Sequence, residues 1–134
     1  LLLTEVERNP QDLDSVILLA HSYFDQGDFA NARNWYARRL EMGTLSSTEE
    51  VFIAMHRLAH AMAQLGEPWQ DIRDAHLRAW AFRPTRAEPL YWIAVHHRVE
   101  KEYLLGYLFA QRAAEIPLPE DDLMLNADVY TDVY

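Results

Sequence analysis

Residues 20–36 read AHSYFDQGDFANARNWY and carry the outline of a helical hairpin. Apolar residues recur at helical spacing up to Phe24, and a second such run begins at Phe29. Between them, Gly27 suits a helix end because it adopts a positive φ at little steric cost. The Asp28 carboxylate suits the N-cap of the following helix. The stretch therefore predicts two helices joined by a tight turn.

The same pattern recurs with a period of about 34 residues, which is typical of stacked helical hairpins. Two later copies are marked by apolar residues, small residues and a closing proline: Trp69, Ile72, His76, Ala79 and Pro84, and then Tyr103, Gly106, Ala110, Ala113 and Pro117. We therefore expect an all-α solenoid of antiparallel helical hairpins, with about three repeats, a leading half repeat and a C-terminal cap.

The predicted organisation is a helical-repeat region, 1–119, followed by an acidic and aromatic tail or cap, 120–134. Glycine and proline divide the first region into the end of a truncated repeat and three hairpins, which are 1–10, 11–43, 47–84 and 85–118. Because the chain does not begin with methionine and a helix is already under way at residue 1, we interpret it as a fragment cut inside a preceding repeat.

Helix starts and turns can be predicted locally. Ser47 with Glu50, and Thr85 with Glu88, have the spacing of capping boxes. The junction at residues 100–102 lacks a glycine, so its turn is expected to differ from the turns at the other hairpins.

The composition restricts the function classes. A formal net charge of −9 argues against nucleic-acid binding through a broad basic surface. The chain has no cysteine, which excludes disulfides and thiolate metal sites and agrees with a reducing, cytoplasmic location. Of the twelve basic residues, only Lys101 is a lysine.

The spacing resembles tetratricopeptide repeats, in which small residues mark close helix crossings and a proline closes the unit. The matching positions are Ala20, Gly27, Ala32 and Tyr36 in the first repeat, Leu58, Ala59, Gly66, Ala79 and Pro84 in the second, and Ala94, Tyr103 and Ala113 in the third. The resemblance covers nearly the whole chain. It implies a protein-binding scaffold.

A second resemblance concerns residues 81–91, AFRPTRAEPLY, together with IPLP at 116–119 and DVY at 128–130. These segments are similar to parts of bacterial family 2 glycosyltransferases, in which a nucleotide-sugar-dependent catalytic domain precedes a tetratricopeptide-like region. The resemblance implies that this chain is the non-catalytic C-terminal region of such a transferase. No catalytic residue, cofactor or metal is then expected in the chain itself.

The first helix of each predicted hairpin would line a concave groove. The expected groove residues are Asp14, Ile17, His21, Phe24, His56, Arg57, His60, Tyr91, Trp92 and Arg98. Aromatic faces suit sugar rings and peptides, and arginine suits carboxylates. We therefore expect a peptide, partner protein or glycan acceptor in the groove, with His21 and His60 as neighbours. The alternative is that these residues pack against the tail or an adjacent domain.

His56 and His60 lie four residues apart on one helix and could share a face. A zinc site would need a third ligand, so no metal is expected there. His96 and His97 are expected to point in different directions.

Two alternatives to the transferase module remain. One is a generic protein-interaction adaptor without sugar chemistry. The other is an oligomerisation module, because Leu1, Leu2, Leu3 and Val6 would leave an apolar end exposed and favour self-association.

Overall fold

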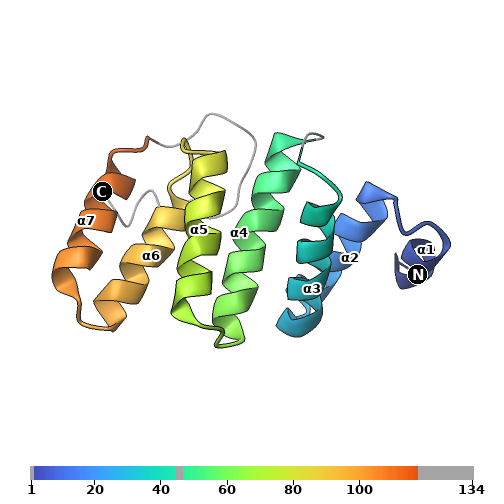
Figure 1. Ribbon diagram of the computed structural model, residues 1–134, viewed down its shortest axis with the longest axis horizontal. Coiled ribbons are helices and arrows are strands. Elements are labelled where there is room, and N and C mark those ends of the chain that lie inside the picture. Colours follow the sequence, from blue (N-terminus) through green and yellow to red (C-terminus); the bar gives the residue numbers. More distant parts are fainter. Residues whose placement is uncertain (1, 45–46, 118–134) are drawn as a thin grey trace. The chain divides into compact units, whose positions relative to one another are not determined.

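The computed structural model describes residues 2–44 and 47–117, and this part of the chain contains α-helices and no strand. The helices are α1 (Leu2–Arg8), α2 (Leu13–Asp25), α3 (Phe29–Glu41), α4 (Thr48–Gln64), α5 (Trp69–Phe82), α6 (Glu88–Val99) and α7 (Tyr103–Ala114) (Figure 1). The all-α prediction is confirmed. The tail or cap predicted at 120–134 lies outside the described residues.

Contacts divide the chain into two units, Leu1–Ile72 and the part from Arg73 onward. In the first unit, α1 packs on α2, α2 on α3, and α3 on α4. In the second unit, α6 packs along α7. The helix pairs α2–α3 and α6–α7 lie within two of the predicted hairpins, 11–43 and 85–118. Helix α5 begins in the first unit and continues into the second.

A hydrophobic cluster holds the start of the first unit together. Its buried members come from α1 and α2, and half-buried side chains pack around them: Val6, Val16 and Leu19, with Leu2, Tyr23, Trp35 and Met42. Val6 is only 3% exposed, whereas Leu3 is 44% exposed. The prediction that Val6 belongs to an exposed apolar end is therefore wrong, because α2 covers it.

Side chains cap three helices of the first unit. The carboxylates of Asp12 and Asp28 accept hydrogen bonds from backbone amides in the first turns of α2 and α3. The Ser47 hydroxyl accepts from the Glu50 amide at 3.3 Å. The Glu50 carboxylate binds Arg39 instead of completing the predicted capping box. Each cap pairs an amide that the helix itself leaves unsatisfied.

Arg39 is a fully buried arginine that joins α3 to the start of α4. Its Nε and Nη2 donate to one Glu50 carboxylate oxygen at 2.9 and 2.6 Å. Its Nη1 donates to the Gly43 carbonyl at 2.9 Å. The guanidinium therefore links Gly43, just after the end of α3, to Glu50 in the first turn of α4.

The hairpin turns share one backbone pattern. Gly27 and Gly66 have positive φ values of 77° and 70°. The amide of each glycine and the amide of the residue after it donate hydrogen bonds to carbonyls in the last turn of the preceding helix. Lys101 adopts the same conformation, with a φ of 62° and the same pair of hydrogen bonds. The prediction of a different turn at 100–102 is therefore wrong. A lysine occupies the left-handed position, at a cost that glycine would not have.

In the second unit, α6 and α7 approach closely because Gly106 lies at their crossing. A Cβ placed on Gly106 would lie 3.4 Å from the Ala94 carbonyl oxygen and from the Arg98 amide nitrogen. The second unit also contains a hydrophobic cluster in which larger half-buried side chains pack against buried residues. The buried members are Ala87, Leu90, Ala113 and Ile116, and the half-buried ones are Leu77, Trp80, Tyr91 and Phe109.

The start of α6 differs from its prediction. Ala87 is the N-cap residue, and no side chain caps the helix. Glu88 is fully buried and forms an ion pair with Arg86, whose Nε lies 3.2 Å from a Glu88 carboxylate oxygen. The Thr85–Glu88 capping box is therefore wrong, because the Glu88 carboxylate binds the buried guanidinium instead.

Candidate functional site

Arg57 lies at the centre of a group of polar and aromatic side chains contributed by α2, α3 and α4. We call this group the Arg57 cluster, and its members are His21, Phe24, Phe29, Tyr36, Arg57 and His60. Arg57 Nη1 lies 3.0 Å from His21 Nδ1 and 3.3 Å from the Tyr36 hydroxyl. His21 Nδ1 also lies 2.5 Å from that hydroxyl. Because arginine only donates hydrogen bonds, Nδ1 is the acceptor and we place the His21 ring proton on Nε2.

Aromatic rings hold the guanidinium from one side. The Arg57 Cζ atom lies 4.8 Å from the centre of the Phe24 ring, which is within cation–π distance. The Phe24 ring in turn lies 5.5 Å from Phe29 and 5.6 Å from His60, measured between ring centres. These contacts restrict the position of the guanidinium.

The cluster suppresses charge on the groups around Arg57. Burial and the Arg57 guanidinium lower the pKa of His21 to about 4, and Asp25 opposes this shift. Burial raises the pKa of Tyr36 to about 12, which Arg57 opposes. Burial and Arg57 also lower the pKa of His60. At neutral pH, Arg57 is therefore the charged member of the cluster.

The lowered pKa of His21 predicts a pH-dependent stability. The unfolded chain has a His21 pKa near 6.5 and the folded chain one of about 4, so the unfolded state binds more protons between these values. The contribution of neutral His21 to the free energy of unfolding is therefore complete above pH 6.5 and decreases as the pH falls to 4. At about 1.4 kcal/mol per pKa unit the shift corresponds to about 3 kcal/mol, and because His21 is only half-buried, solvent screening reduces the expected loss to about 1–2 kcal/mol.

Urea unfolding of the wild type and of His21→Asn at pH 7 and pH 4.5 measures this effect. Asparagine keeps an acceptor near the position of Nδ1 and does not titrate. We expect the wild type to lose stability relative to the variant at pH 4.5. If the free energies of unfolding of the wild type and the variant differed by the same amount at both pH values, the lowered pKa of His21 would be contradicted.

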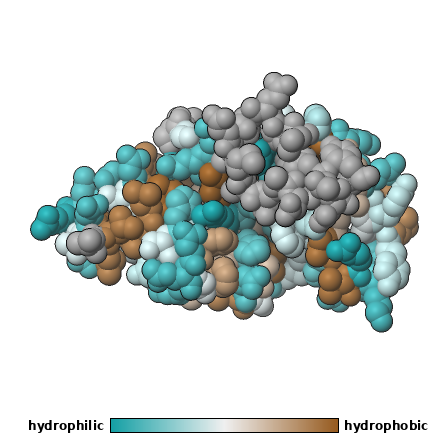
Figure 2. Space-filling model, turned by 180° about the vertical axis from the view of Figure 1, so that it is seen from behind, coloured by the Kyte–Doolittle hydropathy of each residue, from teal (hydrophilic) through white to brown (hydrophobic). Residues whose placement is uncertain are grey.

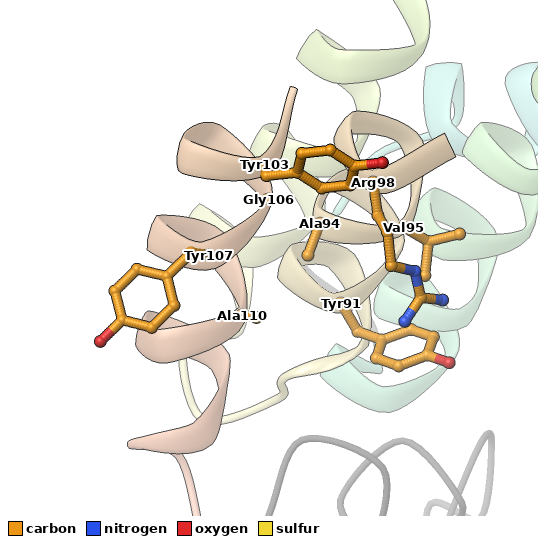
Figure 3. Close-up of a pocket in the computed structure, with 8 residues that line it drawn as sticks. All are labelled: Tyr91, Ala94, Val95, Arg98, Tyr103, Gly106, Tyr107 and Ala110. Carbon is orange, nitrogen blue, oxygen red and sulfur yellow. The ribbon is translucent and has the colours of Figure 1, made fainter. Parts of the chain in front are cut away.

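A pocket of about 440 Å³ lies between α6 and α7 in the second unit. We call it the α6–α7 pocket, and it is lined by Tyr91, Ala94, Val95, Arg98, Tyr103, Gly106, Tyr107 and Ala110. Figure 3 shows Tyr91, Val95 and Arg98 along one side of α6, while the Tyr107 ring extends away from α7. Gly106, Ala94 and Ala110 are the small residues of the lining, and they leave space between the two helices.

Helix α7 also exposes large apolar side chains. The exposed residues are Tyr103, Leu104, Leu105, Tyr107 and Leu108, of which Leu104 is 72% exposed. Figure 2 shows brown hydrophobic areas among hydrophilic ones on one face of the protein. An exposed apolar surface of this kind is typical of a contact site for another molecule.

The structure places the ten predicted groove residues in two groups, one in each unit. In the first unit, His21, Phe24, Arg57 and His60 come together in the Arg57 cluster, where His21 and His60 are linked through Phe24 and Arg57. Asp14 is exposed in the first turn of α2.

Two of the predicted groove residues are not exposed. Ile17 and His56 each have 3% of their surface exposed. The His56 ring stacks on Phe52, with ring centres 6.0 Å apart. Their prediction as exposed groove residues is wrong, because Ile17 lies in the hydrophobic core and the buried His56 ring packs against Phe52.

In the second unit, Tyr91 and Arg98 line the α6–α7 pocket. Trp92 is half-buried and packs edge-on against Tyr91, with ring centres 5.1 Å apart. Tyr103 and Tyr107 line the pocket but were not predicted as site residues, because the predicted groove used only the first helix of each hairpin and α7 is a second helix. Tyr36 was missed for the same reason, although a buried tyrosine hydroxyl requires a partner.

His96, His97 and Glu102 bring ligand atoms within 4.8 Å of one another. His97 Nδ1 lies 3.2 Å from a Glu102 carboxylate oxygen. His96 and His97 were predicted to point in different directions, so this group was not expected. It forms because the turn at Lys101 brings Glu102 back to the end of α6.

Comparisons with solved structures show the fold. MamA matches with a TM-score of 0.72 and 18% sequence identity, over 86% of this chain and 64% of the MamA chain. A second structure, MamA MSR-1 C2, matches with a TM-score of 0.72 and 17% identity, over 86% of this chain and 63% of that chain. The fold is therefore an all-α, tetratricopeptide-like helical solenoid.

The chain spans less than two thirds of the length of the MamA chains. No family model matches the sequence, and no curated protein matches it significantly.

The helices that the structure describes lie within residues 2–44 and 47–117. None of the helices there has the length and apolar content needed to cross a bilayer.

Proposed function

We propose that the chain is a protein-interaction module whose α6–α7 pocket binds a hydrophobic side chain of a partner protein. The pocket carries this proposal. Its volume of about 440 Å³ lies within the range of ligand sites, and tyrosines form much of its lining. Tyrosine offers a large apolar surface with a polar end, which favours contact with a peptide segment. The tetratricopeptide-like fold supports the same function.

The charge of the pocket indicates a second feature of the partner. Arg98 is exposed and forms no ion pair within the described part of the chain. A carboxylate beside the bound hydrophobic residue would pair with this guanidinium. The preferred segment therefore carries an aromatic or large apolar residue next to an acidic one.

An NMR titration tests the proposal with the peptide acetyl-Gly-Phe-Asp-Gly-amide. We expect amide shifts in the pocket lining, and weaker binding of the peptide with asparagine in place of aspartate. Ala110→Phe fills the pocket and should weaken binding at least tenfold. Gln111→Phe is the matched control, because Gln111 is exposed on the same helix outside the lining. Equal binding by both variants would refute pocket binding.

We make a second proposal, which rests only on the resemblance that the sequence of residues 81–91 suggests to family 2 glycosyltransferases. In this case the chain is the C-terminal region of a transferase, and the same pocket holds its acceptor or partner. The gene sequence upstream of residue 1 would encode the nucleotide-sugar-binding domain. Shifts of the pocket lining by an oligosaccharide panel, without shifts by the peptide, would favour this proposal over the generic adaptor.

A further inference from the structure

Three side chains that can ligate a metal ion meet at the turn between α6 and α7. They are His96, His97 and Glu102, and we call them the His–Glu group; one ligand atom from each lies within 4.8 Å of the others. His97 Nδ1 and a Glu102 carboxylate oxygen are 3.2 Å apart. In a tetrahedral zinc site with bonds of about 2.0–2.1 Å, neighbouring ligand atoms lie about 3.3 Å apart. One pair of ligand atoms therefore already has the spacing that a zinc ion requires.

The backbone of the turn directs the Glu102 carboxylate toward the histidines. Lys101 has a φ of 62°, and the Glu102 amide donates to the His97 carbonyl at 2.8 Å. Glu102 is the N-cap residue of α7, but its side chain makes no capping hydrogen bond to that helix. The carboxylate lies against His97 Nδ1 instead. The acidic ligand is thus held on the α6 side of the turn.

Packing fixes the orientation of the His97 ring. The side chain is only 9% exposed. It stacks on Phe109, with ring centres 5.7 Å apart and an angle of 21° between the ring planes. It also meets the His96 ring edge-on, with ring centres 5.3 Å apart. A ligand that is already held in one orientation loses little conformational freedom when an ion binds.

The other two members of the His–Glu group are accessible to solvent. The Glu102 side chain is 50% exposed and His96 is half-buried, so an ion can reach the group and water can complete its coordination. Glu100 acts on His96 through its charge. Arg98 and Lys101 add positive charge to the same turn. Selection of an ion therefore depends on coordination by imidazole and not on net charge.

We propose that His96, His97 and Glu102 bind a divalent transition-metal ion of the zinc class, which clamps the end of α6 to the start of α7. Two imidazoles and one carboxylate, with water in the fourth position, are a known ligand set for Zn²⁺. Imidazole suits zinc, whereas Ca²⁺ and Mg²⁺ prefer oxygen ligands. Because a carboxylate only accepts hydrogen bonds, His97 Nδ1 carries the proton in the present contact, and the ion takes the place of that proton.

This inference goes beyond the proposed protein-interaction function. The ligands lie outside the lining of the α6–α7 pocket, so the ion contributes no surface to peptide binding. Its role is to stabilise the hairpin on which the pocket is built. Binding to the folded chain alone raises stability as the zinc concentration rises.

A zinc titration tests the site. Zinc chloride is added at pH 7 to the untagged, ¹⁵N-labelled chain, and binding is followed by calorimetry and by the ring-nitrogen resonances of the histidines. We expect saturable binding of one equivalent, with the largest changes at His96 and His97. Calcium chloride is titrated in parallel and should leave the ring nitrogens unchanged. The remaining histidines serve as internal controls: His21, His56, His60 and His76.

Two variants identify the ligands. Glu102→Gln removes the carboxylate at an exposed position and should weaken zinc binding by about tenfold or more, the cost of losing even a supporting group of a metal site. Glu100→Gln is the matched control, because it removes the same charge from the same turn and leaves the three ligands in place. Zinc should raise the melting temperature of the wild type and of Glu100→Gln, but not of Glu102→Gln. The amide spectrum of each variant verifies its fold.

Three results would overturn the inference: no saturable change at His96 and His97, equal weakening in Glu102→Gln and Glu100→Gln, or binding of calcium as tight as that of zinc. Equal weakening would mean attraction by charge alone. Neither variant alters the lining of the α6–α7 pocket, so the peptide titration tests the proposed function separately.

Discussion

Replacement of Glu88 by glutamine is expected to lower the free energy of unfolding by about 3–5 kcal/mol, the range found when one partner of a buried ion pair is removed. Glu88 is fully buried and the Arg86 side chain is only 3% exposed. Glutamine has nearly the same shape, but it leaves the buried guanidinium without the Glu88 charge. Urea unfolding followed by circular dichroism measures the loss.

A double variant distinguishes charge from packing at this pair. Arg86→Met with Glu88→Leu removes both charges and keeps apolar volume, so it should be more stable than Glu88→Gln. Glu115→Gln is the control, because the Arg112–Glu115 pair is more than half exposed and should contribute less than about 1 kcal/mol. Equal losses in Glu88→Gln and Glu115→Gln would contradict the buried-pair interpretation.

Replacement of Arg39 by methionine is expected to lower the free energy of unfolding by about 3 kcal/mol, the lower part of the buried-pair range. The Arg39 side chain is fully buried, whereas the Glu50 side chain is 25% exposed and keeps partial solvation. The variant also removes the donor to the Gly43 carbonyl. Methionine occupies much of the vacated volume, so the loss reports mainly on the polar contacts.

The matched control for Arg39 is Arg73→Met. Arg73 pairs with Asp74 on the surface, where both side chains are at least 41% exposed. We expect a change below about 1 kcal/mol there. Unfolding at 0.05 and 0.5 M salt adds a second criterion, because screening weakens exposed pairs more than buried ones. A comparable loss in the two variants would argue against a special role of Arg39.

Much of the backbone could be predicted from local chemistry. Gly27 and Asp28 have physical reasons to lie in a turn, since one tolerates a positive φ and the other caps a helix. Lys101 gave no such signal, because its left-handed conformation is imposed by the packing of α6 on α7. Likewise, the spacing of Thr85 and Glu88 fits a capping box, but the buried Arg86 guanidinium competes for the same carboxylate.

The site could be predicted only in part. Helical spacing placed His21, Phe24 and Arg57 together, and the structure brings them into contact. Spacing alone could not show that Ile17 faces the core or that Tyr36 joins the site, because both depend on how neighbouring helices rotate against each other.

The left-handed turn between α6 and α7 has a practical consequence. Lys101 is the only lysine in the chain, and it is exposed. An amine-reactive dye or crosslinker therefore attaches to one side chain, besides any terminal amine, and that side chain lies two residues before Tyr103 of the α6–α7 pocket. The protein thus carries its own attachment point for a fluorescent reporter or for capture of a bound partner.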